Sequence, residues 1–273
     1  MPRVSSSAAL VTAVFLASAP LRASATQLDD GYRYMYDLRF ADAHRLFQQW
    51  QQIHPDDPMG PVSEAAAYLF SEFDRLRILQ SELFVDNTSL FRFRRPEASP
   101  TVKKKFEAAI RKGLELAQAA LTRQPDDANA QFALVLRQGL YSDYLALIER
   151  RYIDSFSEMK SGRERAQALL AKHPEMYDAY LAIGVENYML SLKPAPLRWI
   201  LRAAGGQTDR DSGIERLRIT AEKGNYLLPF ARLLLAVAAL RENDRQKARE
   251  LLGWLTREFP GNPLYREELA KLH

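Results

Sequence analysis

Four prolines divide the chain into segments that share one pattern. Each of them, Pro55, Pro125, Pro174 and Pro260, follows a run of helix-forming residues. Twelve residues before each proline the side chain is small, and eight and five residues before it the side chains are apolar. These offsets place three side chains on one helical face, where the small residue allows a second helix to approach closely. Proline then ends the helix, because it lacks an N–H group and clashes with the preceding turn.

Acidic pairs follow two of these prolines, at Asp56–Asp57 and Asp126–Asp127. Carboxylates at such positions accept hydrogen bonds from the free N–H groups of the next helix and interact favourably with its dipole. A paired-carboxylate active site or metal site is the alternative interpretation. We favour the capping role, so the pattern predicts a chain of helical hairpins.

The first segment carries the spacing of a known repeat. Gly31, Tyr34, Ala43, Phe47 and Pro55 fall at relative positions 8, 11, 20, 24 and 32. This pattern resembles the tetratricopeptide repeat, although the Trp that its consensus has at position 4 is missing. The stretch 196–252 also looks like exported bacterial repeat proteins and, more distantly, like the tetratricopeptide repeat protein 39 family. The resemblance implies an all-α fold, a right-handed α-solenoid.

The spacing of the prolines predicts about five hairpins and a C-terminal capping helix. We expect the hairpins at 28–54, 61–123, 127–173, 176–224 and 227–259, with the cap at 261–272. Three stretches exceed the length of a repeat and are expected as insertions between the two helices of a hairpin, namely 84–101, 149–162 and 192–213. Equivalent loops of a solenoid emerge on one edge, so these insertions should share a surface. Gly224 takes the place of a fifth proline, and we expect it to end its helix in the left-handed conformation.

Residues 1–25 have the three parts of a secretory signal peptide. Arg3 precedes an apolar run over 8–17, and Ala23-Ser24-Ala25 supplies a small-x-small cleavage pattern. We therefore expect cleavage before Thr26, a mature repeat domain over 26–273, and a secreted or periplasmic location. A mitochondrial transit peptide and an uncleaved anchor are the alternatives.

Composition excludes some functions. The chain has no Cys, so disulfides and thiolate chemistry are excluded. Loss of Arg3 and Arg22 with the signal peptide lowers the formal net charge from +4 to +2, which gives no reason to expect nucleic acid as a partner. The apolar stretch Leu227–Leu240 is too short to span a membrane and contains Pro229 and Arg232, so we expect a buried helix.

The resemblance also implies which residues line the concave groove. In tetratricopeptide arrays these are positions 2, 5, 9, 12 and 13 of each first helix. Carried over to this sequence, they are Leu28, Tyr32, Met35, Tyr36, Ala66, Leu69, Phe70, Asp178, Leu181, Val185, Tyr188, Met189, Phe230, Leu233, Val237, Leu240 and Arg241. The third hairpin has an uncertain register and contributes none. An apolar groove of this kind needs a cover, from a partner or from the chain's own insertions.

We expect a protein or peptide partner in this groove. The residues expected to contact it are Tyr32, Met35, Tyr36, Leu69, Phe70, Tyr188, Met189 and Arg241. The free energy of binding should come mainly from the aromatic side chains, which contribute most of the binding energy of protein interfaces.

The insertions provide a second candidate surface. In "FRFRR" (91–95), Arg92, Arg94 and Arg95 could bind an anion, although a loop that buries its two Phe and exposes its Arg is the interpretation we favour. Arg198 and Trp199 lie in a short amphipathic segment. It could contact a membrane surface or a partner, or pack as a lid over the neighbouring hairpin, and we favour the lid.

Enzyme signatures do not occur in the sequence. The four His residues form no HExxH motif, and Glu186, Asn187 and Tyr188 are interpreted as groove lining. We expect no cofactor, no metal and no catalytic residue, and therefore a non-enzymatic interaction scaffold or adaptor of the cell envelope. An envelope enzyme or enzyme subunit is one alternative, and a peripheral module that binds anionic lipid or glycan at the membrane surface is the other.

Overall fold

The structure is a computed structural model, and it describes residues 26–79 and 97–272 of the 273-residue chain. This part of the chain is predominantly helical and contains no strand, as the sequence predicts. The predicted signal peptide and most of the first insertion lie outside the described residues. Among those residues, none of the helices combines the length and the apolar character that crossing a membrane would need.

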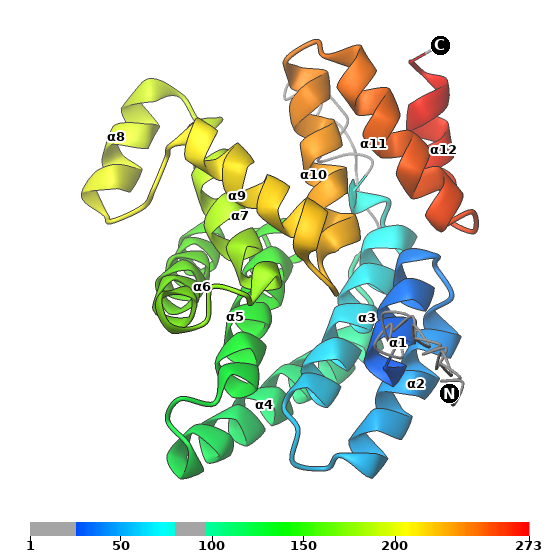
Figure 1. The fold of residues 1–273 in the computed structure, drawn as a ribbon, viewed down its shortest axis with the longest axis vertical. Helices are drawn as coiled ribbons and strands as arrows, with labels where there is room; N and C mark the ends of the chain where they lie inside the picture. The colour runs from blue at the N-terminus through cyan, green and yellow to red at the C-terminus, as the bar shows by residue number, and fades with distance from the viewer. Residues whose placement is uncertain (1–25, 80–96, 273) are drawn as a thin grey trace, which may run out of the picture.

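The helices follow one another with short connections (Figure 1). They are α1 (Gln27–Tyr36), α2 (Phe40–Ile53), α3 (Met59–Arg75), α4 (Pro100–Arg123), α5 (Ala128–Asp143), α6 (Tyr152–Lys172), α7 (Tyr180–Ser191), α8 (Ala195–Ala203), α9 (Arg210–Lys223), α10 (Leu228–Arg241), α11 (Arg245–Glu258) and α12 (Pro263–Ala270). A π-helix (Tyr144–Ile148) extends α5, and a 3-10 turn (Tyr177–Ala179) precedes α7. Helices that are neighbours in the sequence pack against one another, an arrangement compatible with an α-solenoid.

The acidic residues after two of the prolines cap helices, as predicted. Asp127 is the N-cap of α5 and accepts a hydrogen bond from the N–H of Ala130 at 3.0 Å. Asp57 accepts one from the N–H of Met59, the first residue of α3, at 3.0 Å. Each carboxylate therefore satisfies a free N–H group at a helix N-terminus.

Three of the four small residues twelve positions before the prolines lie at close contacts between helices. Ala43 and Ala248 are fully buried. A Cβ atom added to Gly113 on α4 would come within 2.5 Å of the Val62 side chain on α3. A larger side chain at these positions would push the helices apart, so the spacing in the sequence predicts the packing face correctly.

The array curls until its first and last helices touch. In Figure 1 the blue and cyan helices α1 to α3 lie beside the orange and red helices α10 to α12. Asn262 Nδ2 donates a hydrogen bond to the Tyr36 carbonyl oxygen at 3.0 Å, and the Gly261 N–H donates to Asp37 Oδ1 at 2.7 Å. The Tyr36 ring also contacts the Phe259 ring, with centroids 5.7 Å apart. We call this contact between the first and last helices the closing junction.

The second expected insertion, 149–162, is mainly helix. Helix α6 already begins at Tyr152, so Glu149–Arg151 is all that connects it to the π-helix. Ser155, in the first turn of α6, is buried against α5, where the Ser142 hydroxyl donates to its carbonyl oxygen at 3.0 Å. The excess length of this segment therefore lengthens a helix pair instead of forming a loop.

The third expected insertion, 192–213, contains helix α8. No residue of α8 is buried, and the Trp199 side chain is 72% exposed. Figure 1 shows α8 projecting away from the other helices. The favoured interpretation of this segment as a packed lid is therefore wrong.

Gly224 ends α9, but in a different conformation from the one expected. Its φ and ψ are −63° and 162°, which is extended and not left-handed. Glycine is required here for space, because an added Cβ would lie 2.7 Å from Asp178 Oδ1 and 2.6 Å from the Thr220 carbonyl oxygen. The close approach of Asp178 to the backbone therefore explains why residue 224 is a glycine.

Candidate functional site: an apolar pocket inside the curl

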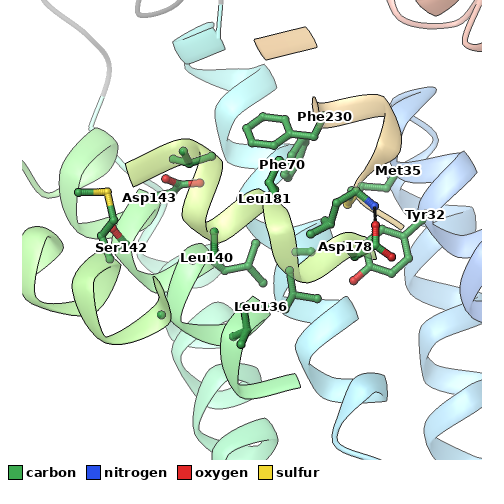
Figure 2. A pocket seen from close by; sticks show the side chains of 18 of the residues that line it. Tyr32, Met35, Phe70, Leu136, Leu140, Ser142, Asp143, Asp178, Leu181 and Phe230 are labelled. Atoms are coloured by element: carbon green, nitrogen blue, oxygen red, sulfur yellow. Dashed lines mark hydrogen bonds between the residues drawn. The ribbon is translucent and has the colours of Figure 1, made fainter. Parts of the chain in front are cut away.

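An open pocket lies on the concave side of the helical array (Figure 2). The space inside it, counted out to the solvent at its open mouth, is about 780 Å³. Helices α1, α3, α5, α6, α7 and α10 contribute its walls. The lining residues are Tyr32, Met35, Tyr36, Ala66, Phe70, Val135, Leu136, Gly139, Leu140, Ser142, Asp143, Met159, Gly162, Asp178, Leu181, Ala182, Val185, Leu227 and Phe230.

Aromatic side chains form the wall next to the closing junction. The Phe70 ring contacts both the Tyr36 ring, at 5.7 Å and nearly perpendicular, and the Phe230 ring, at 5.6 Å. The Tyr36 hydroxyl donates a hydrogen bond to the Tyr226 carbonyl oxygen at 3.1 Å, which fixes the ring. Contacts between residues from α1, α3 and α10 therefore hold this wall in one geometry before any ligand arrives.

Four of the residues predicted to bind a partner line this pocket: Tyr32, Met35, Tyr36 and Phe70. The repeat register thus brings together side chains from the first two helix pairs. Leu181, Val185 and Phe230, which the same register places in the groove, line it as well.

The other four predicted contact residues lie elsewhere. Leu69 is 1% exposed and lines a separate small cavity beside α4. Tyr188 is 1% exposed and packs against α9, where an added Cβ at Gly213 would lie 2.7 Å from the Tyr188 backbone nitrogen. Met189 is half-buried outside the pocket, and Arg241 is exposed at the end of α10. For Tyr188 the register fails because α9 covers this face of α7.

Helix α5 provides a part of the pocket for which the sequence analysis predicted no residues. Leu136, Gly139 and Leu140 lie along its inner side, opposite α7. Pro125 could have located these residues in the sequence. Counting from Pro125 as from Pro55 places these three residues at positions 9, 12 and 13 of the repeat.

The residues predicted to form an anion or edge site are partly covered by the structure, and those it describes lie outside the pocket. Arg92, Arg94 and Arg95 lie outside the described residues. Arg198 Nη1 donates to the Lys193 carbonyl oxygen at 2.9 Å and so helps end α7, while Trp199 points into solvent. Neither Arg198 nor Trp199 lines the pocket.

The buried carboxylate of Glu186 has a structural role. Its carboxylate is fully buried and accepts hydrogen bonds from Arg163 Nε at 3.0 and 3.1 Å and from the Gln207 N–H at 2.9 Å. Burial raises the pKa of Glu186, and the bond from Gln207 and the charge of Arg163 oppose that rise. Asn187 holds the same loop by accepting from the Asp209 N–H at 3.0 Å. These groups anchor the segment that carries α8.

Asp178 closes one end of the pocket by binding backbone. Its two oxygens accept hydrogen bonds from the N–H groups of Asn225, Tyr226 and Leu227 at 2.9 to 3.1 Å. Burial raises the pKa of Asp178, and the three backbone N–H groups oppose that rise. Figure 2 shows Asp178 beside Tyr32, with the bond to Leu227 dashed.

Asp143 lies on the other side of the same pocket and has no such partner. It is the last residue of α5, where the helix widens into the π-helix. Its carboxyl group makes no hydrogen bond or ion pair with any residue in the described part of the chain. Burial alone raises the pKa of Asp143 to about 7.

The described residues contain no group of three or more His, Cys, Asp or Glu side chains that could hold a metal ion. The fold and the pocket together define an all-helical protein with an apolar, aromatic-walled concave site. The chain matches no protein-family model and no curated protein sequence.

Proposed function

We propose that the protein is an interaction scaffold that binds apolar side chains of a partner polypeptide in the concave pocket. The observation that carries this proposal is the pocket itself, an opening of about 780 Å³ with walls of Tyr, Phe, Met and Leu. Buried aromatic side chains supply most of the free energy of protein interfaces. The closing junction fixes these walls, so a ligand binds without first having to order them.

The hydrogen-bond partners of the buried ionisable groups favour a scaffold function over catalysis. Glu186 and Asp178, which could suggest an active site, are bound by Arg163 and by three backbone N–H groups. Both are thereby committed to holding helices and loops together. What remains in the pocket is shape, apolar surface and the single carboxyl group of Asp143.

The proposal includes the finer architecture and the location. It takes the fold as a right-handed solenoid of about five tetratricopeptide-like hairpins with α12 as the cap. It places the mature chain, from Thr26 onward, in the cell envelope. Thr26 is the N-cap of α1: its side chain accepts from the Asp29 N–H, and its own N–H donates to the Asp29 carboxylate.

The experiment uses a variant that fills the pocket without disturbing the fold. Gly139 lines the pocket, and a Cβ added there meets no atom within 4 Å. Gly139→Leu therefore places a side chain in the opening and also replaces glycine within a helix, which favours the helix. Gly253→Leu, in α11 and outside the pocket, is the matched control.

Peptides would first be selected on the immobilised mature protein from a displayed library of random sequences. We expect apolar and aromatic residues in the selected peptides, and at least about a tenfold loss of affinity in Gly139→Leu, or about 1.4 kcal/mol. Gly253→Leu should bind as the wild type does. The proposal is rejected if no peptide is selected, or if Gly139→Leu binds the selected peptides normally.

A second candidate function rests on α8. Leu197, Trp199 and Ile200 are 42%, 72% and 57% exposed on this short helix. The segment 192–208 carries three basic and no acidic side chains. Exposed Trp and Ile beside basic residues are typical of a helix that lies in the interface of an anionic membrane.

The start of α6 belongs to the same edge of the molecule. Gly206, which follows α8, lies against the Phe156 side chain of α6. Tyr152 and Ile153, one turn earlier on α6, are 66% and 86% exposed. These apolar side chains could enter the membrane interface together with those of α8.

Sedimentation with lipid vesicles tests this second function. We expect the protein to bind vesicles that contain phosphatidylglycerol, to bind pure phosphatidylcholine vesicles much less, and to lose binding in Trp199→Ser/Ile200→Ser. Raising the salt concentration should weaken binding by screening the charges. Equal binding of both vesicle types, or an unaffected double variant, excludes α8 as a membrane contact.

A further inference from the structure

The pocket contains acidic groups and no basic ones. Among its lining residues the ionisable side chains are Asp143, Asp178, Tyr32 and Tyr36, and none is Lys, Arg or His. A ligand in this pocket therefore meets a negative electrostatic environment. Whether each acidic group can bind a ligand depends on the hydrogen-bond partners that it already has in the protein.

The two carboxyl groups differ in this respect. Asp178 accepts from the N–H groups of residues 225–227, so its oxygens are occupied by the protein. Asp143 accepts no hydrogen bond from the described part of the chain. Asp143 is partly exposed on the pocket wall, so its carboxyl group is accessible to a ligand there.

The helices around α5 supply no counter-ion for Asp143. Four of their cations are paired with other carboxylates: Arg137 with Glu158, Arg163 with Glu186, Lys103 with Glu149, and Arg75 with Glu72. None of these cations, on α3, α4, α5 or α6, forms a bond with Asp143. No cation in the described part of the chain balances Asp143, so a ligand can supply that charge.

We propose that the pocket selects an apolar group that carries a positive charge, with the Asp143 carboxylate as its counter-ion. This inference rests on the proposed function and names the chemistry of the partner: a Lys or Arg side chain inserted from a polypeptide. The apolar stem of such a side chain matches the Leu and Met walls, and its cationic head reaches the carboxylate. A neutral ligand leaves Asp143 without a partner, and an anionic ligand adds repulsion.

The structure at Asp143 supports a functional role in one further way. The residue ends α5 at the point where the helix turns into five residues of π-helix. Single π-helical turns disturb regular helix hydrogen bonding and occur frequently at functional sites. Gly139, one turn earlier, leaves open space in the pocket beside it.

Three six-carbon probes separate charge from apolar character. Hexylammonium, 1-hexanol and hexanoate share one alkyl chain and differ in charge, and their binding to the mature protein would be measured by calorimetry at pH 8. We expect hexylammonium to bind at least about tenfold more tightly than 1-hexanol, and hexanoate to bind most weakly. In Asp143→Asn, which keeps the shape of the side chain, the three probes should bind within about threefold of one another.

The wild type at low pH gives an independent control. With burial raising its pKa to about 7, Asp143 is ionised at pH 8 and protonated at pH 5.5. Hexylammonium keeps its charge at both values, since alkylamines titrate near the pKa of Lys, about 10.4. Its advantage over 1-hexanol should therefore shrink at pH 5.5 without any mutation.

The outcomes separate this inference from the proposed function. If the wild type binds all three probes equally at pH 8, the pocket accepts apolar groups and the inference on charge is overturned alone. If Asp143→Asn keeps the preference for hexylammonium, Asp143 is not the counter-ion and the inference is likewise overturned. If none of the probes binds, both the apolar pocket as a binding site and the inference fail.

Discussion

Asp143 and Asp178 line the same pocket from opposite sides, yet they play different parts. Asp178 accepts three backbone N–H groups and joins the 3-10 turn before α7 to the segment that leads into α10. Asp143 faces the same apolar walls without a partner in the described part of the chain. Burial raises the pKa of both, so burial alone does not distinguish them. Their hydrogen bonds do, and they separate a structural carboxylate from one that is free to bind.

The largest expected effect comes from removing the structural carboxylate. Asp178→Ala leaves three N–H groups without acceptors, and we expect the free energy of unfolding to fall by about 3–6 kcal/mol. Urea denaturation followed by circular dichroism measures this loss. Asp143→Ala, measured alongside, should cause no such loss, because its carboxyl group accepts no hydrogen bond from the described part of the chain. A loss below about 1 kcal/mol in Asp178→Ala would show that the three bonds are not what holds this segment.

A third buried carboxylate sharpens the comparison, because Glu186 is paired with a side chain. Arg163→Met removes the guanidinium and leaves the Glu186 charge uncompensated, which we expect to destabilise the protein by about 3–5 kcal/mol. The double variant Arg163→Met/Glu186→Met should recover most of that stability. No recovery would mean that Arg163 acts mainly through its bonds to Gln167 and Gly205.

A smaller effect, of the opposite sign, is expected at Asp143. Its pKa in the folded protein is about 7, above the ordinary value of about 3.9, so the folded state holds a proton that the unfolded state releases. Stability from this group is therefore greatest below pH 4 and falls as the pH rises to about 7. At pH 8 we expect Asp143→Asn to be more stable than the wild type by about 1–3 kcal/mol.

The pH series checks that sign. The difference between Asp143→Asn and the wild type should narrow between pH 8 and pH 5 in parallel urea titrations. A wild type that loses stability relative to the variant on acidification would contradict the raised pKa. In that case Asp143 would have a cationic partner in the folded protein.

The smallest effect concerns the aromatic wall between the two carboxyl groups. Tyr36→Phe removes the hydrogen bond to the Tyr226 carbonyl oxygen and keeps the ring, and we expect a loss of about 1 kcal/mol. Tyr152→Phe, at a position that is 66% exposed, should have no measurable effect and serves as the control. Thermal unfolding by calorimetry can compare the two. Equal melting temperatures would show that the hydroxyl of Tyr36 does not fix the wall.

Local patterns in the sequence predicted the helices and one packing face. Proline and acidic residues act on their own neighbours, so Asp127 capping α5 and Gly113 packing on Val62 follow from short-range rules. The same counting rule placed Tyr32 and Phe70 in the pocket.

Contacts between distant parts of the chain could not be predicted. The bond from Asn262 to Tyr36 joins residues 226 positions apart, and no local pattern marks it. The burial of Tyr188 depends on α9 covering α7, and the exposure of Trp199 depends on nothing covering α8. The free carboxyl group of Asp143 is visible only when the surroundings of α5 are known.

The closing junction has a consequence for how the pocket comes into being. One wall contains Tyr36 near the start of the described chain and Phe230 near its end, so the pocket cannot exist on a partly folded array. Helix pairs that contact only their neighbours can form in any order, whereas a contact of such long range forms late, because closing a long loop is entropically unfavourable. Ligand binding would then report on the last step of folding. A chain caught before that step would expose its aromatic wall to the chaperones and proteases around it.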